Sequence, residues 1–468
     1  MQIHIVFLSG GAGSRLWPVS RTKHPKQFLD IQKNGNTMFQ NTLSRLKDIN
    51  ISRYTIVCNE DHRFFIANQF SEINIPNKII IEPEGRNTAP AIALASLFAE
   101  NDEVMLVLPV DHLIFDVTSF TKIINDSVKL AQDKNLITFG IKTTSAHTGY
   151  GYIKKGKKFS NGYRVDEFKE KPSIELASKY HESDKFLWNS GMFMFKPSVY
   201  LNELKKSQPQ IYDACCKASN NYDDKSDFID IDKDEFRKCP ADSIDYAVME
   251  NTNDAIVIPM DVGWNDIGSW NSLWEVSKKD DNLNVINGNV IVEQTTSSFI
   301  DSNNILVATL GVSDLIISVT DDAILVANKN KSDEVKKITD KLASKKMEQQ
   351  HYHRKVYRPW GNYDSVDFGE GFQVKRITVD PKQKLSVQMH HHRSEHWVVV
   401  SGKAIVHYGE EKHELNVNES TYHDKEVVHA LENPSDKPLV LIEVQIGSYL
   451  GEDDIVRYED RYARTQDD

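Results

Sequence analysis

The sequence is poor in cysteine and has no long apolar run. Its 468 residues include four cysteines, Cys58, Cys215, Cys216 and Cys239, whose spacing matches no zinc site. We therefore expect reduced, structural thiols rather than a disulfide scaffold. No stretch reaches the roughly 18 apolar residues of a membrane span, and no cationic leader precedes the apolar N-terminal run. A cytoplasmic protein without membrane association is expected.

Excess positive charge is also lacking. The chain has 56 Lys and Arg against 68 Asp and Glu, a formal net charge of -12. Binding nucleic acid through its phosphates requires a broad positive surface, so we expect no nucleic-acid partner. A small phosphorylated ligand would need a local patch instead. Residues 7–29 offer one, with three glycines in four positions, four Lys or Arg side chains and no Asp or Glu.

Short apolar runs alternate with helical patterns from Ile3 to about Tyr246. The runs "IHIVFL", "YTIVCN", "KIIIEP", "VMLVLPV" and "LITFGI" suit strands covered on both faces. Helix-like stretches such as "TAPAIALASLFAEN" lie between them. This alternation predicts a doubly wound α/β domain with a mixed, mostly parallel sheet over residues 1–283.

The pattern changes twice in the remaining chain. Residues 284–330 consist of short β-like pieces joined by Asn, Asp and Gly turns, which predicts a small β segment of helix or prism type. Residues 331–356 have apolar positions at helical spacing and are interpreted as a linker helix. Residues 357–468 alternate strand and turn patterns, predicting a small β-barrel or jelly roll.

The glycine-rich turn after the first strand is the first candidate site. Gly10, Gly11 and Gly13 would let the backbone approach an anion, with Ser14 following. The dinucleotide-binding fingerprint is incomplete, and no Gly-Lys-Ser/Thr of a nucleotide-hydrolase loop is present. Arg15 can form a planar fork on phosphate oxygens and Lys26 a point charge, so the pair suits a triphosphate.

Several motifs together extend this pattern over about the first 280 residues. They are "GGAGSRLWPVSRTKHPKQF", "EPEGRNTAPAIALA", "LPVDHLI", "GYGYI", "EFKEKP", "WNSGMFMF", "SIDYAVME" and "VGWNDIGSW". In this order and spacing they resemble the sugar-nucleotide pyrophosphorylases, specifically the mannose-1-phosphate guanylyltransferases. The resemblance implies a Rossmann-like nucleotidyltransferase domain.

The resemblance also implies roles for individual residues. Arg15, Lys26 and Lys171 would be catalytic cations, and Asp111 and Asp266 would hold Mg²⁺. Lys171 would neutralise the sugar phosphate. Nucleotide contacts are expected from Gly10, Gly11, Gly13, Ser14, Glu84, Arg86, Asn87 and Asp111. Sugar-phosphate contacts are expected from Gly151, Glu170, Lys171 and Asn189, with Tyr150 as pocket wall.

The reaction implied by the resemblance needs no covalent enzyme intermediate. Mannose 1-phosphate would attack the α-phosphorus of GTP, releasing pyrophosphate and giving GDP-mannose for polysaccharide synthesis. Catalysis would consist of positioning and charge neutralisation. A homo-oligomer, with a dimer as the simplest case, is expected.

A histidine-rich segment is the second candidate site. Ten of the sixteen histidines follow residue 350, and "SVQMHHHRSEHWVVVSGKA" resembles the first motif of a cupin. Gln388 in place of the usual first His agrees with phosphomannose isomerases. The implied metal ligands are Gln388, His390, Glu395 and His429, a set compatible with Zn²⁺, Co²⁺, Mn²⁺ or Fe²⁺.

This second resemblance implies interconversion of mannose 6-phosphate and fructose 6-phosphate through an enediolate. A metal would polarise the carbonyl, a base would move the proton and a cation would hold the phosphate. Arg393, Arg457 and Lys375 are candidates for the last two tasks.

Three alternatives remain open. The cupin domain could be inactive, leaving a guanylyltransferase alone. The whole chain could be a catalytically silent, sugar-nucleotide-binding regulatory protein, although Lys26, Asp111 and Lys171 are all present. A dehydrogenase could use the glycines for NAD, with Glu60 or Asp61 on the ribose, but these lie roughly 50 residues beyond the glycines rather than about 20.

Overall fold

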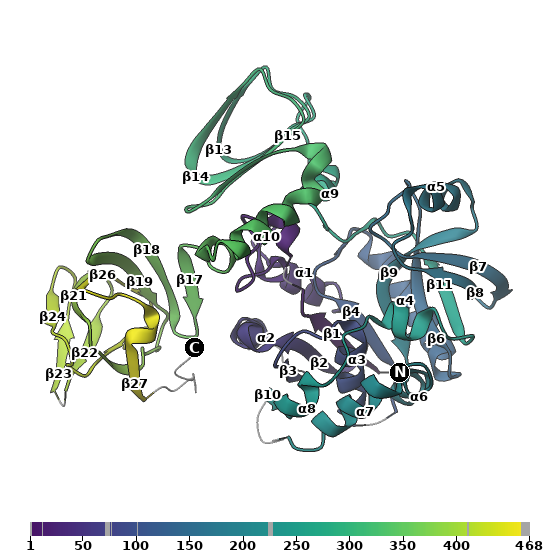
Figure 1. Cartoon of the computed structure of the whole chain (residues 1–468), viewed down its shortest axis with the longest axis horizontal. Coiled ribbons are helices and arrows are strands. Elements are labelled where there is room, and N and C mark those ends of the chain that lie inside the picture. The colour runs from purple at the N-terminus through teal and green to yellow at the C-terminus, as the bar shows by residue number, and fades with distance from the viewer. Residues whose placement is uncertain are drawn as a thin grey trace. The chain divides into compact units, whose positions relative to one another are not determined.

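The computed structural model describes residues 2–11, 13–70, 75, 77–100, 102–222, 228–409 and 411–459. Contacts divide the chain into two compact units, Met1–His351 and Tyr352–Asp468 (Figure 1). The last part of the predicted C-terminal domain, residues 460–468 of 357–468, lies outside the described residues. The predicted boundary at residue 283 falls inside the first unit and stays a prediction.

A ten-stranded mixed sheet forms the centre of the first unit. Its order is β10 (Phe228–Asp230), β3 (Asn77–Glu82), β2 (Ile51–Asn59), β1 (Ile3–Ser9), β4 (Met105–Pro109), β9 (Phe186–Phe195), β6 (Leu136–Lys142), β11 (Ala255–Met260), β8 (Gly162–Lys169) and β7 (Tyr152–Phe159). Strands β10, β3, β2, β1 and β4 run parallel, and β9 enters antiparallel to both β4 and β6. The predicted α/β class with a mixed sheet is confirmed.

Alternate residues of the central strands enter two separate cores. Ile5 and Phe7 pack in one core and Val6 in the other, as expected for a strand buried on both faces. Helices α1 (Met38–Ser44), α2 (Arg63–Phe70) and α4 (Val117–Gln132) contribute to the first core. The second core takes α3 (Thr88–Leu97), α6 (Pro197–Ser207), α7 (Pro209–Ala218), α8 (Lys233–Arg237) and the π-helix η4 (Asp245–Met249).

Smaller elements complete the sheet domain. β5 (Leu113–Ile114) pairs antiparallel with β12 (Trp264–Asn265). Other short elements are η1 (Ser14–Leu16), η2 (Lys26–Phe28), η3 (Glu60–His62), α5 (Ile174–Glu182) and α9 (Trp270–Val276).

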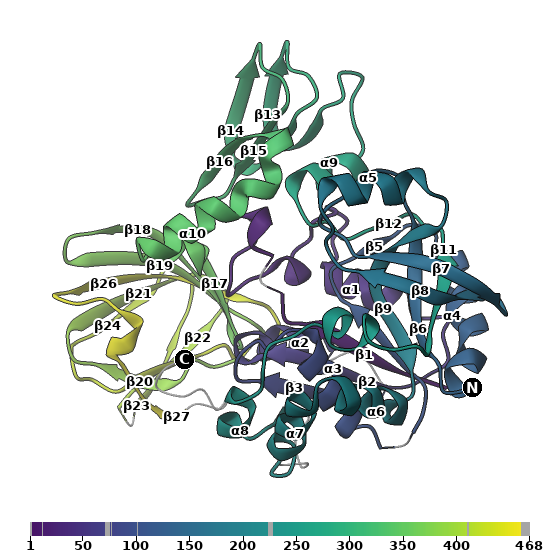
Figure 2. The same cartoon turned by 45° about the vertical axis from the view of Figure 1, so that its right-hand side comes forward.

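A second sheet follows α9 in the first unit. Its order is β13 (Val285–Glu293), β14 (Phe299–Leu310), β15 (Leu315–Val319) and β16 (Ile324–Asn328). The first three strands are parallel although each follows its neighbour directly, which is the arrangement of a β-helix face. Figure 2 shows the four strands next to α10. The predicted linker helix consists of three pieces, η5 (Lys329–Val335), α10 (Lys336–Ser344) and η6 (Glu348–Gln350).

The second unit consists of two sheets, as predicted for a cupin-type jelly roll. One contains β17 (Lys355–Arg358), β18 (Gly361–Gly369), β19 (Phe372–Val379), β26 (Leu439–Gly447), β21 (Arg393–Ser401) and β24 (Ser420–His423). The other contains β23 (Glu411–Leu415), β22 (Ala404–Tyr408), β25 (His429–Glu432), β20 (Val387–His390) and β27 (Ile455–Glu459), and a short η7 (Glu452–Asp454) precedes β27. Apolar residues of both sheets, among them Val399 and Leu431, share one core.

The described residues bear on two further features, membrane spans and the cysteines. No helix there is long and apolar enough to cross a membrane. The four cysteines are free, and Cys58, Cys215 and Cys239 are buried.

Candidate functional site

The glycine-rich turn begins where β1 ends at Ser9. Gly13 has φ +59°, and a Cβ there would lie 2.7 Å from the Ser20 hydroxyl, so the fold itself requires glycine. Gly11 is different, since a Cβ there would meet no atom within 4 Å, and at Gly10 the nearest atom would be Glu82 Oε2 at 3.9 Å. The turn therefore leaves open space beside Gly10 and Gly11, which a ligand can approach.

The four cations that follow the glycines have different environments. Arg21 is fully buried and pairs with Asp322 at 2.9 Å, and Lys23 pairs with Asp61 at 2.5 Å. Lys26 is also buried. The side chain of Arg15 is exposed, with no hydrogen bond or ion pair to the described residues. The interpretation of this segment as one positive patch is thus too simple, because protein carboxylates already neutralise most of its charge.

Lys26 brings together the two aspartates that were expected to bind metal. Its Nζ lies 2.9 Å from Asp111 Oδ2, and it donates to the backbone oxygen of Asp266 at 2.7 Å. The β5–β12 pair positions both aspartates, since Asp111 precedes β5 and Asp266 follows β12. Burial opposes the charge on Asp111, but Lys26 and His112 still hold the pKa of its carboxyl below its usual value.

The expected sugar-phosphate residues form a second group. Lys171 Nζ lies 2.7 Å from Glu170 Oε1, and Asn189 donates to Asp245 Oδ1 at 2.8 Å. A Cβ on Gly151 would lie 2.3 Å from Glu170 Oε2 and 3.2 Å from Asn189 Cβ, so only glycine leaves room for both side chains beside this position. Glu170 Oε2 is buried and has no hydrogen-bond partner among the described residues.

Tyr150 connects the two groups. Its hydroxyl donates to Asp266 Oδ1 at 2.8 Å, and the next residue is Gly151. The ring stacks on His147, with centroids 3.9 Å apart, and contacts Trp188 and Trp264. The predicted pocket-wall residue therefore joins the two groups, through its hydroxyl to Asp266 and through its peptide bond to Gly151.

Glu84, Arg86 and Asn87 form a third group at the start of α3. Arg86 pairs with Glu84 at 2.5 Å, and the Asn87 side chain accepts from the Thr88 amide at 2.9 Å as an N-cap. Thr88 Oγ1 accepts from the amide of Ile244 at 3.0 Å, one residue before Asp245. No hydrogen bond or ion pair joins these three side chains directly to Lys26 or Lys171 within the described ranges.

The predictions missed two buried carboxyls beside these groups. Burial, with Glu170 as the next cause, raises the pKa of Asp245 to about 7. Burial also raises the pKa of Glu82, at the end of β3, to about 8, and Glu82 Oε1 has no hydrogen-bond partner in the described part of the chain. Both residues lie within motifs of the sequence, Glu82 in "EPEGRNTAPAIALA" and Asp245 in "SIDYAVME". The sequence therefore pointed to their position, but it did not show that they are buried.

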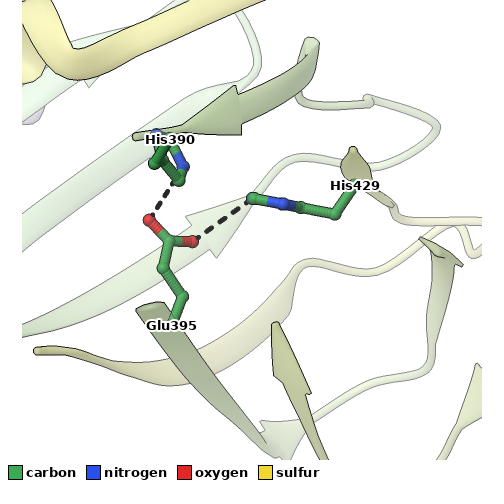
Figure 3. A group of neighbouring side chains, drawn as sticks. All are labelled: His390, Glu395 and His429. Carbon is green, nitrogen blue, oxygen red and sulfur yellow. Dashed lines mark ion pairs between the residues drawn. The ribbon is translucent and has the colours of Figure 1, made fainter. Parts of the chain in front are cut away.

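The cupin unit brings His390, Glu395 and His429 together from β20, β21 and β25 (Figure 3). His390 Nε2 lies 3.1 Å from Glu395 Oε1, and His429 Nε2 lies 3.5 Å from Glu395 Oε2. All three are buried, and one ligand atom from each lies within 4.8 Å of the others. Burial would raise the pKa of Glu395, but His390 and His429 hold it well below its usual value.

Gln388 lies opposite His429 in the β20–β25 register and lines the same cavity as Glu395. Its Oε1 accepts from Ser386 at 3.0 Å. His423, which the predictions missed, stacks on His429 with centroids 4.7 Å apart. Burial, followed by the charge of His429, lowers the pKa of His423 to about 4, so this imidazole is neutral at pH 7.

The three cations expected in the isomerase site line that same cavity. Lys375 pairs with Glu452 at 2.5 Å, and Arg393 pairs with Glu395 at 3.1 Å. Arg457 comes from β27. The predictions also missed Glu443 in this cavity, where burial and then Glu395 raise the pKa of its carboxyl well above the usual value.

Fold and site together define a nucleotidyltransferase with an appended β domain. The family model "Nucleotidyl transferase" matches residues 4–282, and "MannoseP isomerase/GMP-like beta-helix domain" matches residues 288–342. The model "Mannose-6-phosphate isomerase C-terminal" matches residues 328–460.

Curated relatives match nearly the full length. The chain is 49% identical over 463 residues to mannose-1-phosphate guanylyltransferase RfbM of Salmonella typhimurium, covering 97% of this chain and 96% of the relative. It is 48% identical over 474 residues to the mannose-1-phosphate guanylyltransferase of Escherichia coli, covering 99% of each. It is also 49% identical over 464 residues to the xanthan biosynthesis protein XanB of Xanthomonas campestris, covering 98% and 99%.

Two solved structures share the fold at 30% identity. A protein described as mannose-1-phosphate geranyltransferase from Thermus thermophilus superposes with a TM-score of 0.66, covering 73% of this chain and all of that one. A mannose-6-phosphate isomerase from Helicobacter pylori superposes with a TM-score of 0.50, covering 57% and 100%. The chain belongs to the family of mannose-1-phosphate guanylyltransferases with nucleotidyl transferase and mannose-6-phosphate isomerase C-terminal domains, which confirms the predicted resemblance.

Proposed function

We propose that the first unit transfers GMP from GTP to mannose 1-phosphate, giving GDP-mannose and pyrophosphate for polysaccharide synthesis. The observation that carries the proposal is the Lys26 contact. One buried ammonium meets the carboxylate of Asp111 and the backbone of Asp266, and Tyr150 links Asp266 to the Lys171 group. The residues for a triphosphate and for a sugar phosphate thus adjoin each other.

The donor set at Asp111 and Asp266 fits Mg²⁺. Both offer carboxylate oxygens, which this hard cation prefers, and neither is fully buried. When bound, Mg²⁺ would neutralise charge on the phosphate oxygens. The chain's own residues would do the rest. Arg15 and Lys26 would bind the triphosphate, and the glycine-rich turn would allow the phosphates close to the backbone.

Lys171 would orient mannose 1-phosphate so that its phosphate oxygen faces the α-phosphorus in line with the departing pyrophosphate. Glu170 would accept hydrogen bonds from sugar hydroxyls, and Asn189 would donate to them. Glu84, Arg86 and Asn87 would contact the base or ribose. The new O–P bond forms as the bond to pyrophosphate breaks, with no covalent intermediate on the protein. Losing one positioned charge typically lowers such a rate by on the order of 10²–10³.

The decisive experiment incubates the purified full chain with Mg²⁺, GTP and mannose 1-phosphate and follows pyrophosphate release. We expect release only when both substrates and the metal are present. Omission of each component in turn supplies the controls. A complete mixture that yields no pyrophosphate would contradict the proposal and favour a silent, sugar-nucleotide-binding regulatory protein.

We further propose that the second unit interconverts mannose 6-phosphate and fructose 6-phosphate. The group His390, Glu395 and His429 carries this proposal, because two buried imidazoles and a carboxylate suit a transition metal such as Zn²⁺, Co²⁺ or Mn²⁺. The Nε2 atoms of His390 and His429 face Glu395 but form no hydrogen bond with the described residues, as expected for a site that completes its contacts with a metal. Gln388 would be the fourth ligand.

Isomerase activity is tested with fructose 6-phosphate and a panel of divalent ions. We expect His390→Ala to lose both bound metal and isomerase activity while pyrophosphate release stays unchanged. Isomerisation by His390→Ala at the wild-type rate would refute this metal site. Wild-type protein inactive with every ion would favour a cupin unit without catalytic function.

We also propose a homodimer. Ile291, Leu306 and Leu310 on β13 and β14 and Ile324 and Val326 on β16 are exposed apolar side chains, and such surfaces often bind another copy. Light scattering should give twice the chain mass for the wild-type protein and one chain mass for Leu310→Glu. A wild-type protein that is monomeric would contradict this proposal.

A further inference from the structure

The segment that follows the glycine-rich turn is held by a stretch of chain more than 320 positions away. Trp17 Nε1 donates to the backbone oxygen of Gln349 at 2.9 Å. The backbone amides of Thr22 and Lys23 donate to the oxygens of Gln350 and His351 at 3.3 and 3.1 Å. Residues 348–351, which we call the clamp, thus bind the chain between Arg15 and Lys26 at three points.

Arg21 joins the clamp to the β13–β16 sheet. Its guanidinium pairs with Asp322, in the turn between β15 and β16, at 2.9 Å, and also donates to the backbone oxygen of Gln349. Its Nε donates to Pro18 at 2.7 Å. Only 1% of Arg21 is exposed, so this cation is surrounded by protein. A buried charge is tolerated only when it is paired and hydrogen-bonded, which these contacts provide.

Apolar packing also holds this segment. Leu16 and Trp17 belong to a core that includes Val285, Phe299 and Ile316 of the β13–β16 sheet. Trp270 of α9 also donates to the backbone oxygen of Trp17 at 3.1 Å. Arg15 directly precedes Leu16 in the sequence.

Within the turn, Gln27 Nε2 donates to the backbone oxygen of Gly11 at 3.1 Å. Gly10 and Gly11 are adjoined by open space, and Arg15 makes no hydrogen bond or ion pair to the described residues. The position of Arg15 therefore follows from its buried neighbours, Leu16 and Trp17. The core that holds those neighbours includes Trp270 and Leu273, but it also includes residues of the β13–β16 sheet that lie beyond the segment matched by the nucleotidyl transferase model, which ends at 282.

We propose that the β13–β16 sheet and the clamp, acting through Arg21, position the glycine-rich turn and Arg15 for the triphosphate of GTP. Arg21 is then a positioning residue and not a phosphate ligand, although the sequence alone does not distinguish it from Arg15. The inference rests on the proposed function in one respect only, that the turn binds GTP.

The experiment replaces two buried cations of the full chain, Arg21 and, as a control, Lys329. Arg21→Met removes the guanidinium, and Arg21→Lys retains a charge. Lys329→Met is the matched control, because Lys329 is also a buried cation of this region, paired with Asp314 and bonded to the Ser297 oxygen at 2.7 Å, but it does not bond the 17–24 segment. Binding of Mg²⁺-GTP without sugar is measured by calorimetry, and KM is measured for both substrates.

We expect Arg21→Met to weaken GTP binding by on the order of 10-fold, since small misplacements of a binding group are costly. KM for mannose 1-phosphate should change far less. Arg21→Lys should recover part of the GTP affinity, and Lys329→Met should bind GTP as the wild type does. Asp322→Asn, which keeps the side-chain size, should also lose GTP affinity, but by less than Arg21→Met. It is the variant to measure if Arg21→Met fails to fold.

Equal GTP affinity in wild type, Arg21→Met and Asp322→Asn would overturn the inference. An equal loss in Lys329→Met would overturn it too, since the effect would then be general destabilisation. A wild-type protein that binds GTP but releases no pyrophosphate refutes the proposed function alone. One that binds no GTP refutes both.

Discussion

Two alanine substitutions in the glycine-rich turn separate what the fold requires from what a ligand requires. At Gly11, a Cβ meets no protein atom within 4 Å and φ lies outside the left-handed region. At Gly13, φ is +59° and a Cβ would lie 2.7 Å from Ser20 Oγ and 3.1 Å from Lys26 Cγ. The two variants add the same methyl group two residues apart.

The expected stabilities differ in sign. A left-handed conformation costs an alanine about 1–2 kcal/mol, and the contact with Ser20 adds to that, so Gly13→Ala should lower the free energy of unfolding by at least this amount. It should also displace Lys26 and thereby lose activity. Gly11→Ala avoids strain and restricts the unfolded chain, so its free energy of unfolding should be unchanged or raised by up to about 1 kcal/mol.

For Gly11→Ala, the expected effect on GTP affinity is a loss, unlike the expected effect on stability. If the turn cradles the triphosphate, the new methyl of Gly11→Ala occupies space needed by the ligand, and GTP affinity should fall by on the order of 10-fold despite wild-type stability. Denaturant unfolding and calorimetry measure the two quantities. A Gly11→Ala protein with wild-type affinity for GTP would refute the assignment of this turn as the nucleotide cradle.

Three further predictions concern single side chains. Lys171→Ala should raise KM for mannose 1-phosphate far more than KM for GTP, and steady-state kinetics giving equal increases would contradict its role. Asp111→Asn should raise the Mg²⁺ concentration that gives the half-maximal rate, and a metal titration identical to wild type would exclude it as a ligand. Folding raises the pKa of Asp245 from 3.8 to about 7, so the folded state binds a proton that the unfolded state releases, and stability falls as pH rises from about 4 to about 7. Asp245→Asn should lose this part of the pH dependence, and melting curves at several pH values that slope as steeply as those of the wild type would show that Asp245 is not its source.

Local sequence patterns were sufficient to predict most strands and to single out His390, Glu395 and His429, which lie together in the structure. Continuous apolar runs became β1, β2 and β4 because each must cover two cores. His390 and Glu395 lie five residues apart on β20 and β21, which are consecutive in the chain but belong to the two facing sheets, and His429 on β25 joins them.

Burial and long-range pairing were not accessible in the same way. Nothing near Arg21 in the sequence distinguishes it from Arg15, because its partner Asp322 lies 301 positions away. Likewise Asp245 and Glu82 look like ordinary acidic residues of a motif until the packing around them removes water. The 331–356 segment was predicted only as a linker helix, yet its Gln350 and His351 accept backbone hydrogen bonds from Thr22 and Lys23.

These hydrogen bonds affect how the protein can be recombined with its relatives. A chimaera joined at residue 283 would combine a glycine-rich turn from one parent with a β13–β16 sheet and residues 348–351 from the other. Its Arg21 would depend on an aspartate and backbone oxygens supplied by a different sequence. A junction placed after His351 keeps all of these contacts within one parent, so a chimaera joined there should keep Arg21 and the segment around it in place.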